Sequence, residues 1–296
     1  MIPLALLILG LAIVTIGSVA DLRWREVPDW SNYFGISAAL MIRTIYSLGT
    51  GSWGYVFEGL LGLGAMYCLA CGLFYLGQWG GGDSKLLMAL GAIFGLGFSP
   101  DSTGGLMGSF LVNLILFGGI WGGFWSVKLA IEHQTEVSKA YKSLMRKKAV
   151  LHAKMYFFVI ALGLLALAFA FPITSPAGSY QFRIPLIILA ATGLLTFYTW
   201  GFAKSVEKAC FIKNVPVKNL EEGDWIQHDI LVKGKRLAGP SDLGVSRDQI
   251  KALNLSGLKT VTVKEGVPFV PGFFLAYAAT ILVGNGFMAI VSAIGG

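Results

Sequence analysis

The sequence has little charge and little cysteine. Only 13% of its 296 residues are charged and 55% are hydrophobic, whereas about 25% of the residues in a soluble domain are charged. This shortage excludes an ordinary cytosolic globule and a disordered chain. Three cysteines are too few for a disulfide framework or for an all-cysteine zinc site. The composition therefore indicates a polytopic membrane protein.

The N-terminal stretch, residues 1–20, lacks the basic region and the A-x-A-like cleavage site of a secretory signal peptide. We therefore expect it to be a retained first span. The net charge of +7 could suggest nucleic-acid binding. In a membrane protein, however, basic residues gather in cytoplasmic loops and meet anionic lipid headgroups. We expect anionic lipid headgroups, and not nucleic acid, as partners.

Several stretches approach the roughly 20 apolar residues that a helix needs to cross a bilayer. They are 3–20, 30–48, 54–77, 84–99, 106–127, 153–172, 184–203 and 268–291. The fourth is short and rich in glycine. The expected fold class is an all-α polytopic transmembrane helix bundle of about eight spans, with a small mixed α/β cytoplasmic insert before the last span.

Lysine and arginine predict the orientation, because loops rich in these residues stay in the cytoplasm. If the N-terminus lies outside, all of the 23 basic residues except Arg43 and Arg183 fall on the cytoplasmic side. An even number of spans then places the C-terminus outside as well.

Three domains are expected: a transmembrane catalytic domain over 1–203, a cytoplasmic insert over 204–267 and a final transmembrane helix over 268–296. Within the first, the polar segment 128–152 is expected to form a cytoplasmic helical hairpin or an amphipathic extension. Its basic run, Arg146-Lys147-Lys148, either contacts anionic headgroups or acts only as a positive-inside signal.

The insert has the pattern of a small mixed fold. The expected elements are a strand over 225–232, a turn at 233–235, a helix over 247–253 capped by Ser246 and ended by Gly257, and a strand over 260–263. Roughly 60 residues cannot bury a large core, so we expect the insert to pack against the membrane domain.

Ionisable residues at membrane depth are costly and usually functional. The candidates are Asp21, Asp29, Glu58, Asp83 and Asp101. Glu58 and Asp101 fall at the outer surface, where we expect solvated charges. Asp29 follows Pro28 and is expected to cap the second span.

Asp21 and Asp83 differ from the other carboxylates. Asp21 ends an apolar span, where the negative end of the helix dipole opposes a carboxylate, so a need other than helix stability should place it there. Asp83 precedes the fourth span, where a lone aspartate would be an N-cap. Because the first and fourth spans meet the same cytoplasmic face, the two carboxylates lie at one depth and can face each other.

Two carboxylates at one site are the minimum set of catalytic groups for aspartic peptide hydrolysis. One, ionised, deprotonates a water molecule; the other, protonated, polarises the scissile carbonyl and later protonates the leaving amine. Gly80, Gly81 and Gly82 precede Asp83 and have no side chains, so an extended substrate can approach closely. Their alternative role is a flexible turn between helices.

Two motifs follow one another along the chain. Asp21-Leu22-Arg23-Trp24-Arg25-Glu26-Val27-Pro28 precedes Gly80-Gly81-Gly82-Asp83-Ser84-Lys85-Leu86. Together they resemble the type IV prepilin peptidases, GxGD-type aspartic proteases that pair D-x-R-x-x-x-[IV]-P at the end of the first helix with G-x-G-D-x-K-L. The resemblance is close over roughly residues 15–95 and extends to the rest only in hydropathy.

The resemblance implies a membrane aspartic endopeptidase. Such an enzyme removes short basic leader peptides from membrane-inserted prepilin or preflagellin (archaellin) precursors at the cytoplasmic face, without a metal or cofactor. The implied residues are the catalytic Asp21 and Asp83, the substrate-approach loop Gly80, Gly81 and Gly82, and the supporting Lys85, Arg23, Arg25 and Asp29.

The sequence departs from many bacterial members of this family. Those members carry an early cytoplasmic domain with two Cys-x-x-Cys pairs and also N-methylate their product, whereas the few residues between Asp21 and Trp30 leave no room for that domain. The pair Cys68 and Cys71 lies inside an expected span, where packing is the better interpretation. Methyl transfer is therefore not expected, and the insert before the final span resembles the archaeal preflagellin peptidase branch.

Two other functions stay open. Relatives of presenilin and signal peptide peptidase share GxGD but have Tyr-Asp and Pro-Ala-Leu motifs, where this chain has Ala20-Asp21 and Pro271-Gly272-Phe273. A transporter that binds cations or protons through the two aspartates would need them near the bilayer midplane, between pseudo-symmetric halves.

Local charges also predict which aspartate is the general base and which is the general acid. The helix N-terminus and Lys85 favour the ionised form of Asp83, whereas the negative end of the first helix favours the protonated form of Asp21. Arg23 and Arg25 oppose this second effect. The sequence therefore predicts Asp83 as the general base and Asp21 as the acid.

Overall fold

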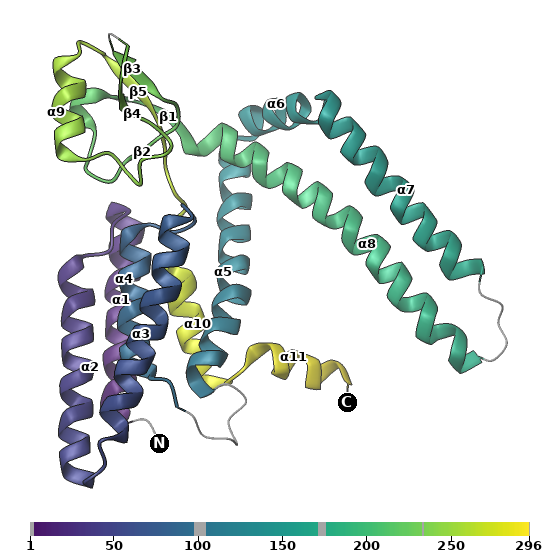
Figure 1. Ribbon diagram of the computed structural model, residues 1–296. Helices are drawn as coiled ribbons and strands as arrows, with labels where there is room; N and C mark the ends of the chain where they lie inside the picture. The colour runs from purple at the N-terminus through teal and green to yellow at the C-terminus, as the bar shows by residue number, and fades with distance from the viewer. Residues whose placement is uncertain (1–2, 98–104, 171–175, 233, 296) are drawn as a thin grey trace. The chain divides into compact units, whose positions relative to one another are not determined.

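The computed structural model describes residues 3–97, 105–170, 176–232 and 234–295, and helices dominate it (Figure 1). The helices are α1 (Leu4–Trp24), α2 (Asp29–Thr50), α3 (Gly54–Tyr75), α4 (Gly81–Phe94), α5 (Gly105–Glu132), α6 (Gln134–Met145), α7 (Lys148–Ala170), α8 (Pro176–Val206), α9 (Arg247–Leu255), α10 (Val270–Leu282) and α11 (Gly286–Gly295). The strands are β1 (Ile212–Pro216), β2 (Trp225–Ile226), β3 (Ile230–Val232), β4 (Lys235–Ala238) and β5 (Thr260–Lys264). The expected fold class, a helical membrane bundle with a small mixed region, is confirmed.

Among the described residues, 5 helices are long and apolar enough to cross a membrane: Leu4–Trp24, Gly54–Tyr75, Gly105–Glu132, Lys148–Ala170 and Phe182–Phe211. The other expected spans are also helical. However, α2 is more polar, α4 has only 14 residues and α10 only 13. The total of eight spans and the outer placement of both termini stay predictions.

The last expected span, 268–291, is two helices rather than one. Gly284, with a φ of 80°, separates α10 from α11. Asn113 of α5 holds this break, because its side-chain NH₂ donates to the Gly284 carbonyl at 2.7 Å and its side-chain oxygen accepts from the Gly286 N–H at 2.9 Å. The apolar run predicted a continuous helix because the polar side chain that stabilises the break lies on another helix.

Helix α4 is enclosed by its neighbours and packs against α1, α2 and α3. Leu86, Leu90 and Ile93 of α4 are at most 1% exposed. Glycines allow α3 and α4 to cross closely, since a side chain on Gly62 would overlap the backbone of Gly91. This enclosure fixes the helix that begins at the GxGD motif.

Arg43 of α2 stabilises the other end of α4. Its guanidinium is buried and donates to the carbonyls of Ala92 and Ile93, both at 2.9 Å, and to that of Tyr55 in α3 at 2.7 Å. The last carbonyls of a helix have no partner within the helix. Arg43 therefore caps α4 and ties it to α2 and α3.

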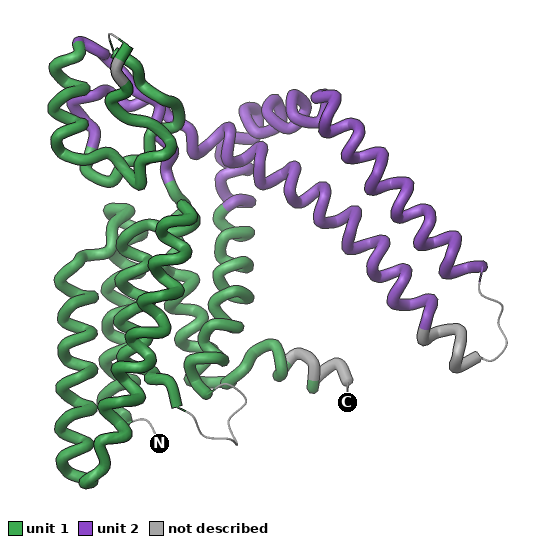
Figure 2. The backbone as a smooth tube through the Cα atoms, viewed as in Figure 1, with its two compact units in different colours: residues 1–125, 221–256, 266–296 green, residues 126–220, 257–265 purple. Residues whose placement is uncertain are grey.

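The chain forms two compact units (Figure 2). Unit 1 comprises residues 1–125, 221–256 and 266–296, and unit 2 comprises residues 126–220 and 257–265. The domain boundaries expected after residues 203 and 267 stay a prediction.

Unit 1 contains part of the insert. Ser246 and Gln249 form a reciprocal capping box at the start of α9, which confirms the expected N-cap. The strand expected over 225–232 is interrupted, and β2 and β3 are its two ends. Between them the chain bends, and the carboxylate of Asp229 accepts a hydrogen bond from Arg236 of β4 at 2.7 Å, so this stretch is drawn toward its neighbour instead of extending.

Unit 2 contains the rest of the insert and a long helical pair. β1 and β5 pair antiparallel, with Ile212 opposite Lys264, so the strand expected over 260–263 is confirmed. Helices α7 and α8 pack side by side, and α6 packs against α8 (Figure 1). The helical structure expected over 128–152 is formed by the end of α5, by α6 and by the start of α7.

Candidate active site

Asp21 lies in the last turn of α1 and is 7% exposed. The helix ends at Trp24, and Arg25 follows with a φ of 59° in the left-handed region, which is uncommon for a residue other than glycine. The Arg25 N–H donates to the Asp21 carbonyl at 3.1 Å. The carboxylate is therefore held on a rigid helix end, away from bulk water.

The N-terminus of α10 meets this carboxylate. Val270, the first residue of α10, donates its backbone N–H to Asp21 Oδ2 at 2.9 Å. Ser18, one turn earlier in α1, donates from Oγ to the Val270 carbonyl at 3.2 Å. A helix N-terminus carries partial positive charge and unpaired N–H groups that bind anions. This contact therefore favours an ionised Asp21, whereas the sequence-based argument considered only the negative end of α1.

Two side chains bind the segment that leads into α10. Trp121 of α5 donates its Nε1–H to the Pro268 carbonyl at 2.7 Å. Arg25 donates from Nη1 to the Gly266 carbonyl at 3.4 Å, and its guanidinium carbon lies 5.2 Å from the ring centroid of Trp125. Arg25 therefore links the end of α1 to the segment that positions Val270.

The same segment contacts the loop before α4. Trp79, which precedes the glycine run, has its ring centroid 5.9 Å from that of Phe269 and 5.4 Å from that of Phe273. The start of α10 thus contacts both elements that carry an expected catalytic aspartate.

Asp83 is the third residue of α4, whose N-cap is Gly80. Val27, from the loop after α1, approaches this turn closely: a Cβ on Gly82 would lie 3.0 Å from the Val27 Cβ. Asp83 precedes the apolar run at 84–99. Burial raises the pKa of Asp83 to about 7, and repulsion from the Asp21 carboxylate contributes to this shift.

The two aspartates lie at the same end of two helices that pack together. α1 ends with Asp21 where α4 begins with Asp83. One turn away from the aspartates, a Cβ on Gly17 of α1 would lie 3.8 Å from Leu86 Cδ2 of α4. The structure therefore brings the two sequence-predicted residues together, near enough for the charge of one to affect the titration of the other.

Asp29 and Lys85 do not lie as expected. Pro28 is the N-cap of α2 and no side chain caps the helix, so the predicted cap is wrong. Asp29 is already inside the first turn, and its Oδ1 accepts from Lys85 Nζ at 2.6 Å. Lys85 was expected to favour ionisation of Asp83; it is instead paired with Asp29, which joins α2 to α4.

The remaining candidates are more peripheral. Arg23 is exposed on the last turn of α1. The carboxylate of Glu58 lies 3.9 Å from Arg43 Nη1 and is 46% exposed, and Asp101 lies outside the described residues. In the described part of the chain, no group of three or more His, Cys, Asp or Glu residues could hold a metal ion.

Residues 8–127 match the model of the type IV leader peptidase family. Over these residues, the chain is similar to this family. The matched region contains both aspartates, the glycine run, Arg25 and Trp121, whereas Val270 lies beyond it. No curated protein matches the chain significantly.

This match supports a peptidase that cleaves leader peptides, with prepilin-type proteins as its substrates. The 5 long apolar helices among the described residues, together with this match, indicate a multi-pass membrane protein. Sequence reasoning missed the start of α10, because a backbone N–H 249 residues from Asp21 leaves no local signal in the sequence.

Proposed function

We propose that the chain is an aspartic endopeptidase in which Asp21 and Asp83 act as one dyad. One observation carries this proposal: the two carboxylates occupy the same end of the packed helices α1 and α4, and Asp21 raises the pKa of Asp83. Two carboxylates that cannot both ionise readily share one proton, which is the state that peptide hydrolysis requires.

In this proposal, Asp21 is the base and Asp83 the acid. Burial favours the protonated form of both carboxylates. At Asp21 the N–H of Val270 and the positive end of α10 oppose this effect, whereas at Asp83 repulsion from Asp21 adds to it. Asp21 takes a proton from water as the water oxygen bonds to the scissile carbonyl carbon, and Asp83 donates a hydrogen bond to the carbonyl oxygen. The C–N bond then breaks, and the dyad supplies a proton to the leaving amine. This order is the reverse of the one predicted from the sequence.

The supporting residues have separate roles in this scheme. Gly80, Gly81 and Gly82 form a rim without side chains beside Asp83, where an extended leader peptide can approach the dyad. The Asp29–Lys85 ion pair holds α2 against α4, and Arg25 binds the segment before α10. Arg23 is exposed at the end of α1, where it can meet lipid phosphates or solvent.

The proposed substrates are membrane-inserted prepilins or preflagellins with a short basic leader, cut at the cytoplasmic face. The distribution of lysine and arginine supports this face, since it places the ends of α1 and α4 that carry the aspartates inside. The insert before the final span, over residues 204–267, supports the preflagellin branch of archaea.

Replacing either aspartate by asparagine tests the dyad. Asp21→Asn and Asp83→Asn should each lower kcat/KM at least about a thousandfold, because asparagine keeps the size but cannot exchange a proton. The assay follows release of the leader by mass spectrometry, with the purified full-length chain and a synthetic precursor that joins a basic leader to an apolar helix.

Asp29→Asn is the matched control, because it removes a carboxylate of the same size from a half-exposed ion pair. Its kcat/KM should change less than about fivefold, since such pairs contribute little. Retention of a tenth of the wild-type activity by either dyad variant would refute the proposal.

A further inference from the structure

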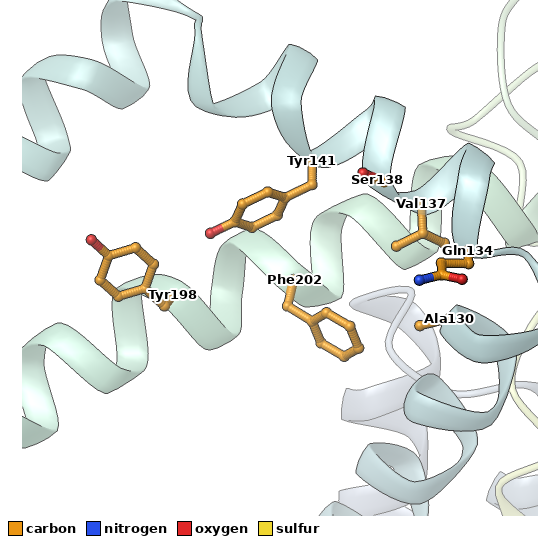
Figure 3. Close-up of a pocket in the computed structure, with 7 residues that line it drawn as sticks. All are labelled: Ala130, Gln134, Val137, Ser138, Tyr141, Tyr198 and Phe202. Carbon is orange, nitrogen blue, oxygen red and sulfur yellow. The ribbon is translucent and has the colours of Figure 1, made fainter.

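Unit 2 contains a groove between α6 and α8 (Figure 3), with a volume of about 340 Å³. Ala130, Val137 and Phe202 provide its apolar part. Ser138 and Tyr141 of α6 and Tyr198 of α8 bring hydroxyl groups to it, and Figure 3 shows the two tyrosine rings on facing helices. The groove is therefore apolar inside and has hydroxyl groups among its lining.

The helices beside the groove have the surface of membrane spans. Both α7 and most of α8 are long and apolar enough to cross a bilayer. Large apolar side chains on them are exposed, among them Phe158, Ile188 and Leu195. Tyr198 and Phe202 lie at the end of the expected span over 184–203. Tyrosine is enriched at this depth, where its ring meets lipid and its hydroxyl meets water.

A basic stripe borders the groove. Lys139, Lys142 and Arg146 are spaced by three and four residues along α6 and its C-cap, so they share one helix face. Lys142 follows Tyr141 and lies one turn after Ser138, which places the stripe next to the groove. All three cations are exposed.

The acids at the ends of this region pair with other cations. Glu132 lies 3.8 Å from Lys128, and Glu207 lies 2.7 Å from Lys204. Helix α6 itself has one acidic residue, Glu136, against two lysines. The edge of the groove therefore presents net positive charge.

The charge at the edge of the groove distinguishes between two apolar occupants. An open groove can take either one face of a partner helix or a lipid acyl chain. An anionic lipid also brings a phosphate for the exposed lysines of α6, whereas an apolar helix leaves them without an anionic partner.

We propose that this groove binds an anionic phospholipid, with an acyl chain between α6 and α8 and the phosphate on Lys139 and Lys142. The acyl chain fills the apolar part of the groove, which water solvates poorly. The lipid phosphate gains the ammonium groups of the two lysines as partners. The site belongs to unit 2 and does not depend on the roles proposed for the aspartates.

Native mass spectrometry of the purified full-length chain tests the proposal. In detergent with equal amounts of phosphatidylglycerol and phosphatidylcholine, we expect preferential retention of phosphatidylglycerol. The double variant Lys139→Gln/Lys142→Gln should weaken its binding about thirtyfold, because each lysine near a lipid phosphate contributes about a fivefold effect. Lys218→Gln/Lys259→Gln, which also removes two exposed positive charges, is the charge-matched control in unit 2 and should bind as the wild type does.

A second variant tests the acyl chain. Ser138→Phe fills the groove and should displace both lipids, and inorganic phosphate, which has charge but no chain, should not compete with phosphatidylglycerol. Equal retention of the two lipids, wild-type binding by the double lysine variant, or competition by phosphate would overturn the proposal. Displacement of the lipid by an apolar transmembrane peptide alone would assign the groove to the substrate instead.

Discussion

The two aspartates have different surroundings. Asp21 is buried and accepts a backbone hydrogen bond from Val270 at the start of a helix, whereas Asp83 is half-buried at the start of its own helix, beside the first carboxylate. For the charge of a carboxylate, the helix end that faces it thus matters more than the end of the helix that contains it. At Asp21, the facing end belongs to α10.

The pH dependence of cleavage should report Asp83. As the general acid it must be protonated, and its pKa is raised to about 7. The protonated fraction, and with it kcat/KM, should fall as the pH rises through that value, giving an alkaline limb near neutrality. Measuring kcat/KM against pH with the synthetic precursor checks this expectation.

Lys85→Met provides the control for the pH profile. Because Lys85 pairs with Asp29, its loss should leave the alkaline limb in place. A profile that stays flat to about pH 9 would contradict an acid role for Asp83. A large shift of either limb in the lysine variant would instead favour the assignment in which Lys85 keeps Asp83 ionised.

Among the elements, the start of α10 holds the site together. It bonds to Asp21, packs against Trp79 and is bound in turn by Trp121 of α5. Trp121→Phe keeps an aromatic side chain, although a smaller one, and removes the N–H that binds Pro268. Since an unpaired buried carbonyl costs roughly 1–3 kcal/mol, Val270 should lose its position and kcat should fall roughly tenfold.

The Michaelis constant distinguishes positioning from general damage. Trp121→Phe should leave KM nearly unchanged, because the indole N–H binds the protein and not the substrate. Trp53→Phe, at an exposed position before α3, should match the wild type in both constants. An unchanged kcat in the Trp121 variant would show that α10 does not need this bond.

At the scale of the whole molecule, membrane topology decides whether the site can meet its substrate. In a background without Cys68, Cys71 and Cys210, a cysteine at Ser52 should react with an impermeant thiol reagent added from outside. A cysteine at Ser143 should react only after permeabilisation. Both serines are exposed, so burial does not limit labelling, and the opposite pattern would place the aspartates on the outer face.

Much of this arrangement could be predicted from the sequence. Asp21 and Asp83 stood out because carboxylates beside apolar spans are costly, and Ser246 was identified because a capping box is encoded within four residues. The contacts of Val270, Asn113 and Asp29 could not be predicted in this way. Each depends on which distant helix lies beside it, and a periodic pattern describes one helix at a time.

The hydrogen bond between Val270 and Asp21 has a consequence for biosynthesis. A ribosome that adds 5–20 residues per second needs roughly 12–50 s to cover the 249 residues that separate the two. Asp21 is translated at the start of that interval and Asp83 early in it, but the helix end that faces Asp21 is translated only at its close. The hydrogen bond that Asp21 accepts can therefore form only after all of the chain up to the start of α10 has been made.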